Sequence, residues 1–225
     1  MVALPDGTIL ILNGAQQGLA GFAKATDPNL NALLYDPSLP VGSRFSILAS
    51  STIARMYHSE ATLLPDGRVL ISGSDPEDKW RNGTVRYPQE QRIEVFIPPY
   101  LTSGLKQPTF TLPINDWAYG SSHSITQVKL FQGTLSTLRI SLISASSSTH
   151  GNSMGAKTIF PAFSCSGVGC TIVAPPNAGI CPPGWYQLFI LDGPTPSVSK
   201  WVRIGGDPSK LGNWPNFPGF TLPGV

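Results

Sequence analysis

The sequence is poor in charged residues. Only 12% of its 225 residues are Asp, Glu, Lys or Arg, and the formal net charge is +2. That fraction is about half of the ~25% typical of soluble domains. No run of basic residues occurs anywhere in the chain. A nucleic acid or an acidic membrane surface therefore has no electrostatic basis as a partner.

Long apolar stretches are also missing. No segment approaches the ~20 consecutive apolar residues that a membrane-spanning helix requires, so we expect no membrane segment. The first six residues, Met1 to Asp6, contain neither the basic nor the apolar region of a signal peptide. They run almost directly into a strand-turn-strand pattern. We therefore expect either a truncated gene model or a missing upstream region.

Cysteine is scarce, with three residues in the whole chain. Cys165 and Cys170 flank Ser-Gly-Val-Gly, which is typical of a hairpin tip, and we predict a disulfide between them if the protein is secreted. Cys181 would then be the free thiol. The spacing lacks the second cysteine pair that a zinc site needs. The sequon Asn82-Gly83-Thr84 also favours secretion, although such sequons often occur by chance.

Turn-forming residues are abundant. The chain has 23 Gly and 22 Pro and shows no helical periodicity, which indicates an all-β protein. The phrase Leu-Pro-Asp-Gly-x-(Ile/Val)-Leu occurs at residues 4–10 and again at residues 64–70, and each copy predicts a β-hairpin. The 60-residue separation is near the ~50 residues of a kelch blade. Because propellers close with ~4–8 blades, residues 1–98 are predicted to be a partial kelch-type β-propeller of at most one and a half blades.

The character of the chain changes after Pro98-Pro99-Tyr100. Seven short strands at roughly even spacing predict an immunoglobulin-like β-sandwich over residues 99–205, followed by a Pro/Gly-rich tail over residues 206–225. Trp185 and Trp201 are predicted to lie in its core. The expected strands are 108–112, 123–127, 135–142, 157–163, 171–174, 185–191 and 199–204.

Candidate metal ligands stand at two places. Tyr57 and His58 precede the second hairpin, and His150 lies in a Ser/Thr/Gly-rich segment. Imidazole and oxygen donors suit Cu(II). Neighbours on a regular strand point to opposite faces, so Tyr57 and His58 can share a metal only where the backbone is irregular, as directly after a turn. His123 lies between two serines and is expected to have no metal role.

Several phrases together resemble the C-terminal part of the copper-radical oxidases, the glyoxal oxidase and galactose oxidase family. The resemblance spans roughly residues 1–205 and implies a kelch propeller followed by an early-set, immunoglobulin-like sandwich. The phrases are Leu12-Asn13-Gly14-Ala15-Gln16-Gln17-Gly18, Leu34-Tyr35-Asp36-Pro37, Arg55-Met56-Tyr57-His58-Ser59, Leu64-Pro65-Asp66-Gly67-Arg68-Val69-Leu70, Ile93-Glu94-Val95-Phe96, Pro98-Pro99-Tyr100-Leu101, Thr149-His150, Pro175-Pro176-Asn177, Pro182-Pro183-Gly184-Trp185-Tyr186 and Ser197-Val198.

The resemblance also implies a copper site. Tyr57 matches the family's axial tyrosine, which can act as the catalytic base, and His58 and His150 match its two histidine ligands. His150 would reach the propeller axis on a long polar loop, Ser146 to Gly151, so the three side chains are expected to converge. The segment after His150 departs from the family pattern His-Ser-x-Asn-Met-x-Gln-Arg, because Ala156-Lys157 replaces Gln-Arg.

The family's radical cofactor, a tyrosine cross-linked to a cysteine, belongs to earlier blades. Tyr35 and the three cysteines stand in the wrong sequence context to replace it. The resemblance thus implies a C-terminal fragment of a secreted oxidase that converts a small aldehyde or primary alcohol and O2 into oxidised product and H2O2, inactive as this chain alone. The alternative is a non-catalytic kelch/early-set module that binds carbohydrate or a cell-wall partner. An upstream cysteine and tyrosine able to cross-link would favour the oxidase.

Overall fold

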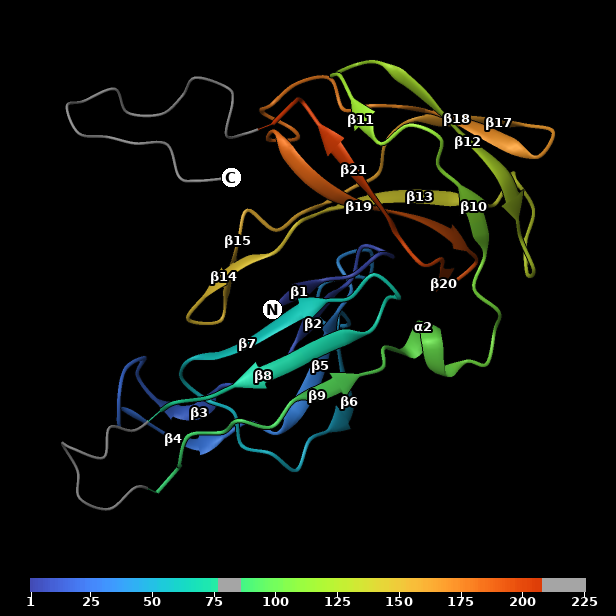
Figure 1. Cartoon of the computed structure of the whole chain (residues 1–225). Helices are drawn as coiled ribbons and strands as arrows, with labels where there is room; N and C mark the ends of the chain where they lie inside the picture. The colour runs from blue at the N-terminus through green and yellow to red at the C-terminus, as the bar shows by residue number, and fades with distance from the viewer. Residues whose placement is uncertain (77–85, 208–225) are drawn as a thin grey trace, which may run out of the picture.

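The computed structural model describes residues 1–76 and 86–207. The Asn82 sequon and nearly all of the predicted tail over residues 206–225 lie outside the described residues. The described part is almost entirely β-structure, as the sequence predicts, and it contains no helix long and apolar enough to cross a membrane. Two small antiparallel sheets lie below a two-sheet sandwich in the view of Figure 1.

The N-terminal part forms two blade-like sheets, which confirms the propeller-like expectation. The first blade sheet has the strand order β1-β2-β5-β6, and the second has the order β7-β8-β9. The strands are β1 (Val2–Ala3), β2 (Ile9–Ile11), β5 (Asn31–Tyr35), β6 (Phe45–Ser50), β7 (Ser59–Leu63), β8 (Val69–Gly73) and β9 (Glu94–Phe96).

The two Leu-Pro-Asp-Gly phrases form matching turns. In the second, the backbone N–H of Leu64 donates to Arg68 O, and the carboxylate of Asp66 accepts the backbone N–H of Arg68. In the first turn, Leu4 N–H donates to Thr8 O in the same way. The last residue of each phrase's turn is a glycine at positive φ, 95° and 90°, which non-glycine residues rarely adopt.

An unexpected hairpin lies between β2 and β5 and consists of β3 (Ala15–Gly18) and β4 (Ala25–Pro28). Its strands carry no apolar alternation, and most of their side chains are exposed. This hairpin therefore forms by backbone pairing without the hydrophobic alternation that predicts a strand. A second unexpected element is the one-turn helix α2 (Pro99–Thr102), which follows the second blade sheet.

The C-terminal part is a β-sandwich, as predicted. One sheet has the order β10-β12-β18-β17, and the other has the order β11-β21-β19-β13-β16, with β20 paired to β19. The strands are β10 (Thr109–Thr111), β11 (Asp116–Trp117), β12 (Ser122–Lys129), β13 (Arg139–Ser144), β16 (Thr158–Ile159), β17 (Phe163–Ser166), β18 (Gly169–Val173), β19 (Gly184–Asp192), β20 (Thr195–Pro196) and β21 (Lys200–Ile204).

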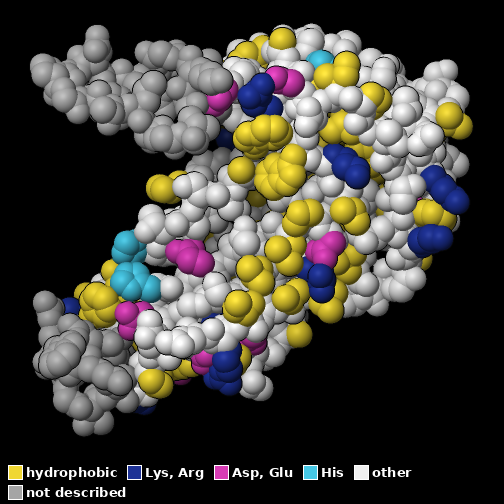
Figure 2. Space-filling view, viewed as in Figure 1, with side chains coloured by type: hydrophobic (Ala, Val, Ile, Leu, Met, Phe, Trp, Pro, Cys, Tyr) yellow, Lys and Arg dark blue, Asp and Glu magenta, His cyan; other side chains and the backbone are white. Residues whose placement is uncertain are grey.

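Three of the sandwich predictions need correction. The strand expected at residues 135–142 begins only at Arg139, and the strand expected at 157–163 is broken into β16 and β17. Trp185 and Trp201 are not in the core, because 44% and 40% of their surface is exposed. Both lie on the face of β19 and β21 that turns away from the sandwich interior, beyond the area that the blade sheets cover. Figure 2 shows hydrophobic side chains gathered over these strands.

The two parts share a core because β13 and β19 are buried on both faces. On β13, Ile140 and Leu142 belong to the sandwich core, whereas Ile143 packs with residues of the blade sheets. On β19, Leu188 faces the sandwich interior and Phe189 faces the blades. Burial on both faces explains the continuous apolar run at residues 188–191, in which no alternation is visible.

The cysteines follow the prediction. Cys165 and Cys170 face each other across β17 and β18 and form a disulfide. Cys181 is free and fully buried beneath the sandwich surface. Burial raises the pKa of its thiol, because the low-dielectric interior disfavours the thiolate.

Candidate metal centre

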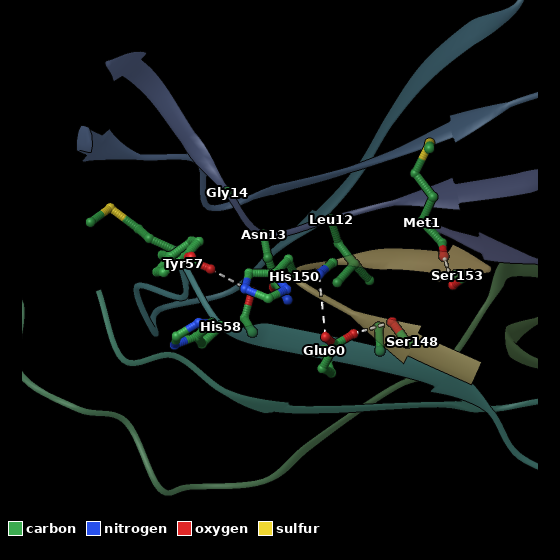
Figure 3. Close-up of a pocket in the computed structure, with 14 residues that line it drawn as sticks. Met1, Leu12, Asn13, Gly14, Tyr57, His58, Glu60, Ser148, His150 and Ser153 are labelled. Atoms are coloured by element: carbon green, nitrogen blue, oxygen red, sulfur yellow. Dashed lines mark hydrogen bonds between the residues drawn. The ribbon is translucent and has the colours of Figure 1, made fainter. Parts of the chain in front are cut away.

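Tyr57, His58 and His150 come together in the structure. The ring centroids lie 4.0 Å apart for Tyr57 and His58, 5.4 Å for Tyr57 and His150, and 5.0 Å for His58 and His150. Ninety-two positions separate the two histidines in sequence. Figure 3 shows the three side chains side by side at one end of a pocket. His123, by contrast, stacks on Trp117 in the sandwich, with the ring centroids 4.8 Å apart.

The Tyr57-His58 pair lies in an irregular turn that leads into β7. His58 has a φ of 63°, in the left-handed region that few non-glycine residues occupy. Both the backbone N–H and the hydroxyl of Ser59 donate to Met56 O, which closes the turn around the pair. The irregular backbone allows the neighbouring rings of Tyr57 and His58 to stack, with 27° between their planes, instead of pointing to opposite faces.

A buried arginine holds the start of this turn. Only 1% of the Arg55 side chain is exposed, and its guanidinium donates to the carboxylate of Glu94 and to the backbone carbonyls of Gly73 and Arg92, each at 2.8 Å. The backbone carbonyl of Arg55 in turn accepts the N–H of Gly14, three residues after β2 of the first blade sheet. Arg55 therefore fixes the turn against both blade sheets.

Glycine is required at residue 73, where β8 passes the turn. A Cβ at Gly73 would lie 2.8 Å from the carbonyl oxygen of His58, closer than side-chain carbons are ever found, and the residue has a φ of 73°. The absence of a side chain lets β8 approach the histidine turn. The turn is also tied to the next segment, because the N–H of Asp75 donates to Tyr57 O.

His150 lies at the tip of a hairpin, not in the flexible loop that the sequence predicts. The hairpin consists of β14 (Ser147–Thr149) and β15 (Asn152–Met154), and His150 and Gly151 form its two-residue turn. Both turn residues have positive φ, 55° and 75°, as a type I′ turn requires. The hydroxyl of Thr149 lies 2.7 Å from Nδ1 of His150, which leaves Nε2 as the ring nitrogen available to another partner.

Two further residues at this place were not expected from the sequence. Phe22, from the tip of the β3–β4 hairpin, packs edge-on against Tyr57 and His58 with ring centroids 5.4 and 5.2 Å away. Glu60 lies on β7, two residues after His58, and accepts hydrogen bonds from Ser148 and Gly151, on either side of His150. Strand alternation does not relate Glu60 to His58, because His58 lies before β7 in a left-handed conformation.

One pocket of about 210 Å³ between the blade sheets and the hairpin is lined by Tyr57, His58, Glu60 and His150. Its lining mixes polar and apolar groups and includes both histidines, which Figure 2 shows meeting at the surface of the molecule. The lining residues are Met1, Leu12, Asn13, Gly14, Met56, Tyr57, His58, Ser59, Glu60, Ala61, Ser148, His150, Gly151 and Ser153.

Comparison with known proteins matches both halves of the chain. Residues 1–100 match the family described as glyoxal oxidase N-terminus, and residues 107–204 match the galactose oxidase-like early set domain. The chain belongs to the glyoxal oxidase and galactose oxidase family. It is 62% identical over 225 residues to a WSC domain-containing protein of Arthroderma benhamiae, and 38% identical over 215 residues to aldehyde oxidase GLOX1 of Arabidopsis thaliana.

These relatives are much longer than the chain. It spans 23% of the Arthroderma protein and 35% of the Arabidopsis one, although the alignments cover 100% and 90% of the chain itself. Among solved structures, it resembles a fungal alcohol oxidase of the AA5 family in complex with copper, with a TM-score of 0.76 and 25% identity. That likeness covers 90% of this chain and 41% of the oxidase.

The donor set fits a copper ion. Two imidazoles that bind one metal at about 2 Å from each nitrogen have ring centroids at most about 6 Å apart, and those of His58 and His150 are 5.0 Å apart. The described residues contain no group of three or more His, Cys, Asp and Glu that could hold a metal ion. The phenol of Tyr57 lies beside the two imidazoles, with its ring centroid 4.0 Å from that of His58 and 5.4 Å from that of His150, and a mixture of nitrogen and oxygen donors suits Cu(II).

Proposed function

We propose that this chain is the C-terminal copper-binding part of a glyoxal-oxidase-like copper-radical oxidase. The observation that carries the proposal is the convergence of Tyr57, His58 and His150 from two separate parts of the fold. We further propose that residues 1–98 supply the last propeller blades and residues 99–205 the early-set sandwich. Helix α2, between β9 and β10, supports this division.

In the proposed reaction a primary alcohol or a hydrated aldehyde loses two electrons and two protons. O2 takes up the two electrons and the two protons and becomes H2O2. Copper, when bound, would accept one of the two electrons. Tyr57, in its phenolate form, would receive the proton of the substrate hydroxyl as a positioned base and become the neutral phenol, because it lines the pocket beside both histidines. His58 and His150 would hold the ion. The second electron is assigned to the family's tyrosine–cysteine group, for which this chain offers no candidate.

Two features of the structure concern the cysteine that a tyrosine–cysteine group would need. Two of the three cysteines are joined in the β17–β18 disulfide, and the third is buried in the sandwich. A disulfide is also typical of proteins that leave the reducing cytosol, which supports the proposal that the parent oxidase is secreted. The alternative function, a carbohydrate- or cell-wall-binding module, has no comparable convergence of side chains in the part of the chain that the structure describes.

Copper titration of the purified chain tests the proposal. The chain should bind one Cu(II), and its electron paramagnetic resonance spectrum should show two imidazole nitrogens. His58→Ala and His150→Ala should each abolish tight binding, whereas the control His123→Ala should retain it, because that ring lies on β12 in the sandwich. Equal binding by all three variants would overturn the assignment.

Activity provides a second test. The copper-loaded chain alone should produce no H2O2 from glyoxal, methylglyoxal or galactose, because it has no candidate for the radical group. Copper-dependent turnover by this chain would contradict the fragment interpretation.

A further inference from the structure

Within the described residues, the hairpin that carries His150 pairs with no other strand. Strands β14 and β15 form a two-stranded sheet of their own, and most of their side chains are exposed. Isolated two-stranded hairpins are only marginally stable in water. The position of His150 therefore depends on contacts with the blade sheets, namely the ring contacts with Tyr57 and His58 and the polar contacts of the hairpin backbone and serines.

Strand β7 supplies these contacts from one face. Glu60 and Thr62, two residues apart, face the hairpin residues Ser148 and Ser146, which are also two residues apart. The Thr62 hydroxyl donates to Ser146 Oγ at 3.1 Å. Residues i and i+2 of a strand share a face, so Glu60 and Thr62 of β7 form a short polar ladder with Ser148 of β14 and with Ser146, which lies directly before β14.

Glu60 is the residue of this ladder that reaches the tip. Its Oε1 accepts the backbone N–H of Gly151 at 3.2 Å, and its Oε2 accepts the hydroxyl of Ser148. The two donors lie on either side of His150 in the chain. Figure 3 shows Glu60 beside Ser148 and His150. One side chain thus holds both sides of the turn in which His150 has its unusual φ of 55°.

We propose that Glu60 is a positioning residue, which sets the distance from His150 to His58 and so completes the metal site. The inference rests on the proposed copper function. Glu60 and His58 are two residues apart on the entry to the same strand, so the carboxylate ties one histidine's segment directly to the other histidine's hairpin. Residues that orient metal ligands without touching the metal typically contribute 10–100-fold to metal affinity.

The test compares Glu60→Ala and Glu60→Gln with the unaltered chain. Glu60→Ala should weaken Cu(II) binding by about 10–100-fold, and its paramagnetic resonance spectrum should change from two imidazole nitrogens to one. Glu60→Gln should recover most of the affinity, because its amide oxygen still accepts from the tip. Asp116→Ala is the matched control, since it removes a carboxylate that pairs with Arg203 in the sandwich, and it should bind copper normally.

A metal-free measurement separates this proposal from the copper function. Amide hydrogen exchange of Gly151 should be faster in Glu60→Ala than in the unaltered chain, and unchanged in Asp116→Ala. If His58→Ala and His150→Ala bind copper normally, the proposed function fails, whatever Glu60 does. If those two variants lose copper but Glu60→Ala keeps both the affinity and the two-nitrogen spectrum, the positioning role is overturned. A Glu60→Gln variant as impaired as Glu60→Ala would also overturn it, because charge rather than hydrogen bonding would then decide.

Discussion

Replacing Arg55 by methionine should strongly destabilise the chain. Methionine fills a similar volume but removes the guanidinium donor from the carbonyls of Gly73 and Arg92 and from the Glu94 carboxylate, which keeps only the Ser51 hydroxyl. Removing one partner of a buried ion pair costs about 3–5 kcal/mol. Because 27% of the Glu94 side chain is exposed, water can solvate the abandoned carboxylate, and we expect the lower end, about 3 kcal/mol.

Thermal unfolding followed by circular dichroism measures this loss. A change of about 3 kcal/mol in a chain of this size lowers Tm by roughly 6–12 °C. Arg68→Met is the control, because 46% of that side chain and 34% of its partner Asp66 are exposed; it should change Tm by no more than about 2 °C. Adding Glu94→Leu to Arg55→Met should recover part of the loss by removing the carboxylate that has lost its guanidinium partner. If Arg55→Met unfolds within about 2 °C of Arg68→Met, the buried arginine does not hold the turn as we argue.

Three further predictions concern single sites. Gly73→Ala should lower Tm and copper affinity more than Gly104→Ala does, because the two glycines have φ values of 73° and 72° but an added Cβ meets a backbone oxygen only at Gly73; equal effects would show that backbone strain alone matters. Cys181 should resist alkylation in the folded chain and react after denaturation, because burial raises the pKa of its thiol, and non-reducing peptide mapping should find the disulfide in the β17–β18 hairpin; labelling of the native thiol would contradict this. In the complete oxidase, Tyr57→Phe should retain copper but slow turnover by roughly 10²–10⁴-fold if the phenol is the base; an unchanged rate constant would remove that role.

The sequence predicted those features that depend on local chemistry. The two Leu-Pro-Asp-Gly turns and the cysteine hairpin are fixed by residues within a few positions of one another, and the structure confirms them. The meeting of Tyr57 and His58 with His150 could be expected only from the family resemblance, because no local pattern relates positions so far apart.

The features that the sequence did not predict depend on contacts between distant segments. Glu60 reads as an ordinary polar residue of a half-buried strand until the partner hairpin is placed against it. Phe22 lies in a segment without apolar alternation, so the sequence pattern does not predict its contact with the Tyr57 ring. Trp185 was placed in the core because aromatic residues usually are, but β19 extends past the blades that cover its other end.

The double burial of β13 has a consequence for how copper and folding would be linked. This strand is packed between the sandwich core and the blades, and the hairpin that carries His150 begins three residues after it ends. His58 thus belongs to the blades and His150 to the sandwich, on the two sides of the apolar contact that β13 makes with the blades. A metal that binds only the docked arrangement, present at about 100 times its dissociation constant, would stabilise that arrangement by roughly 2.7 kcal/mol. Loss of the ion and separation of the layers would then be one event, and chelation should loosen the fold far from the site.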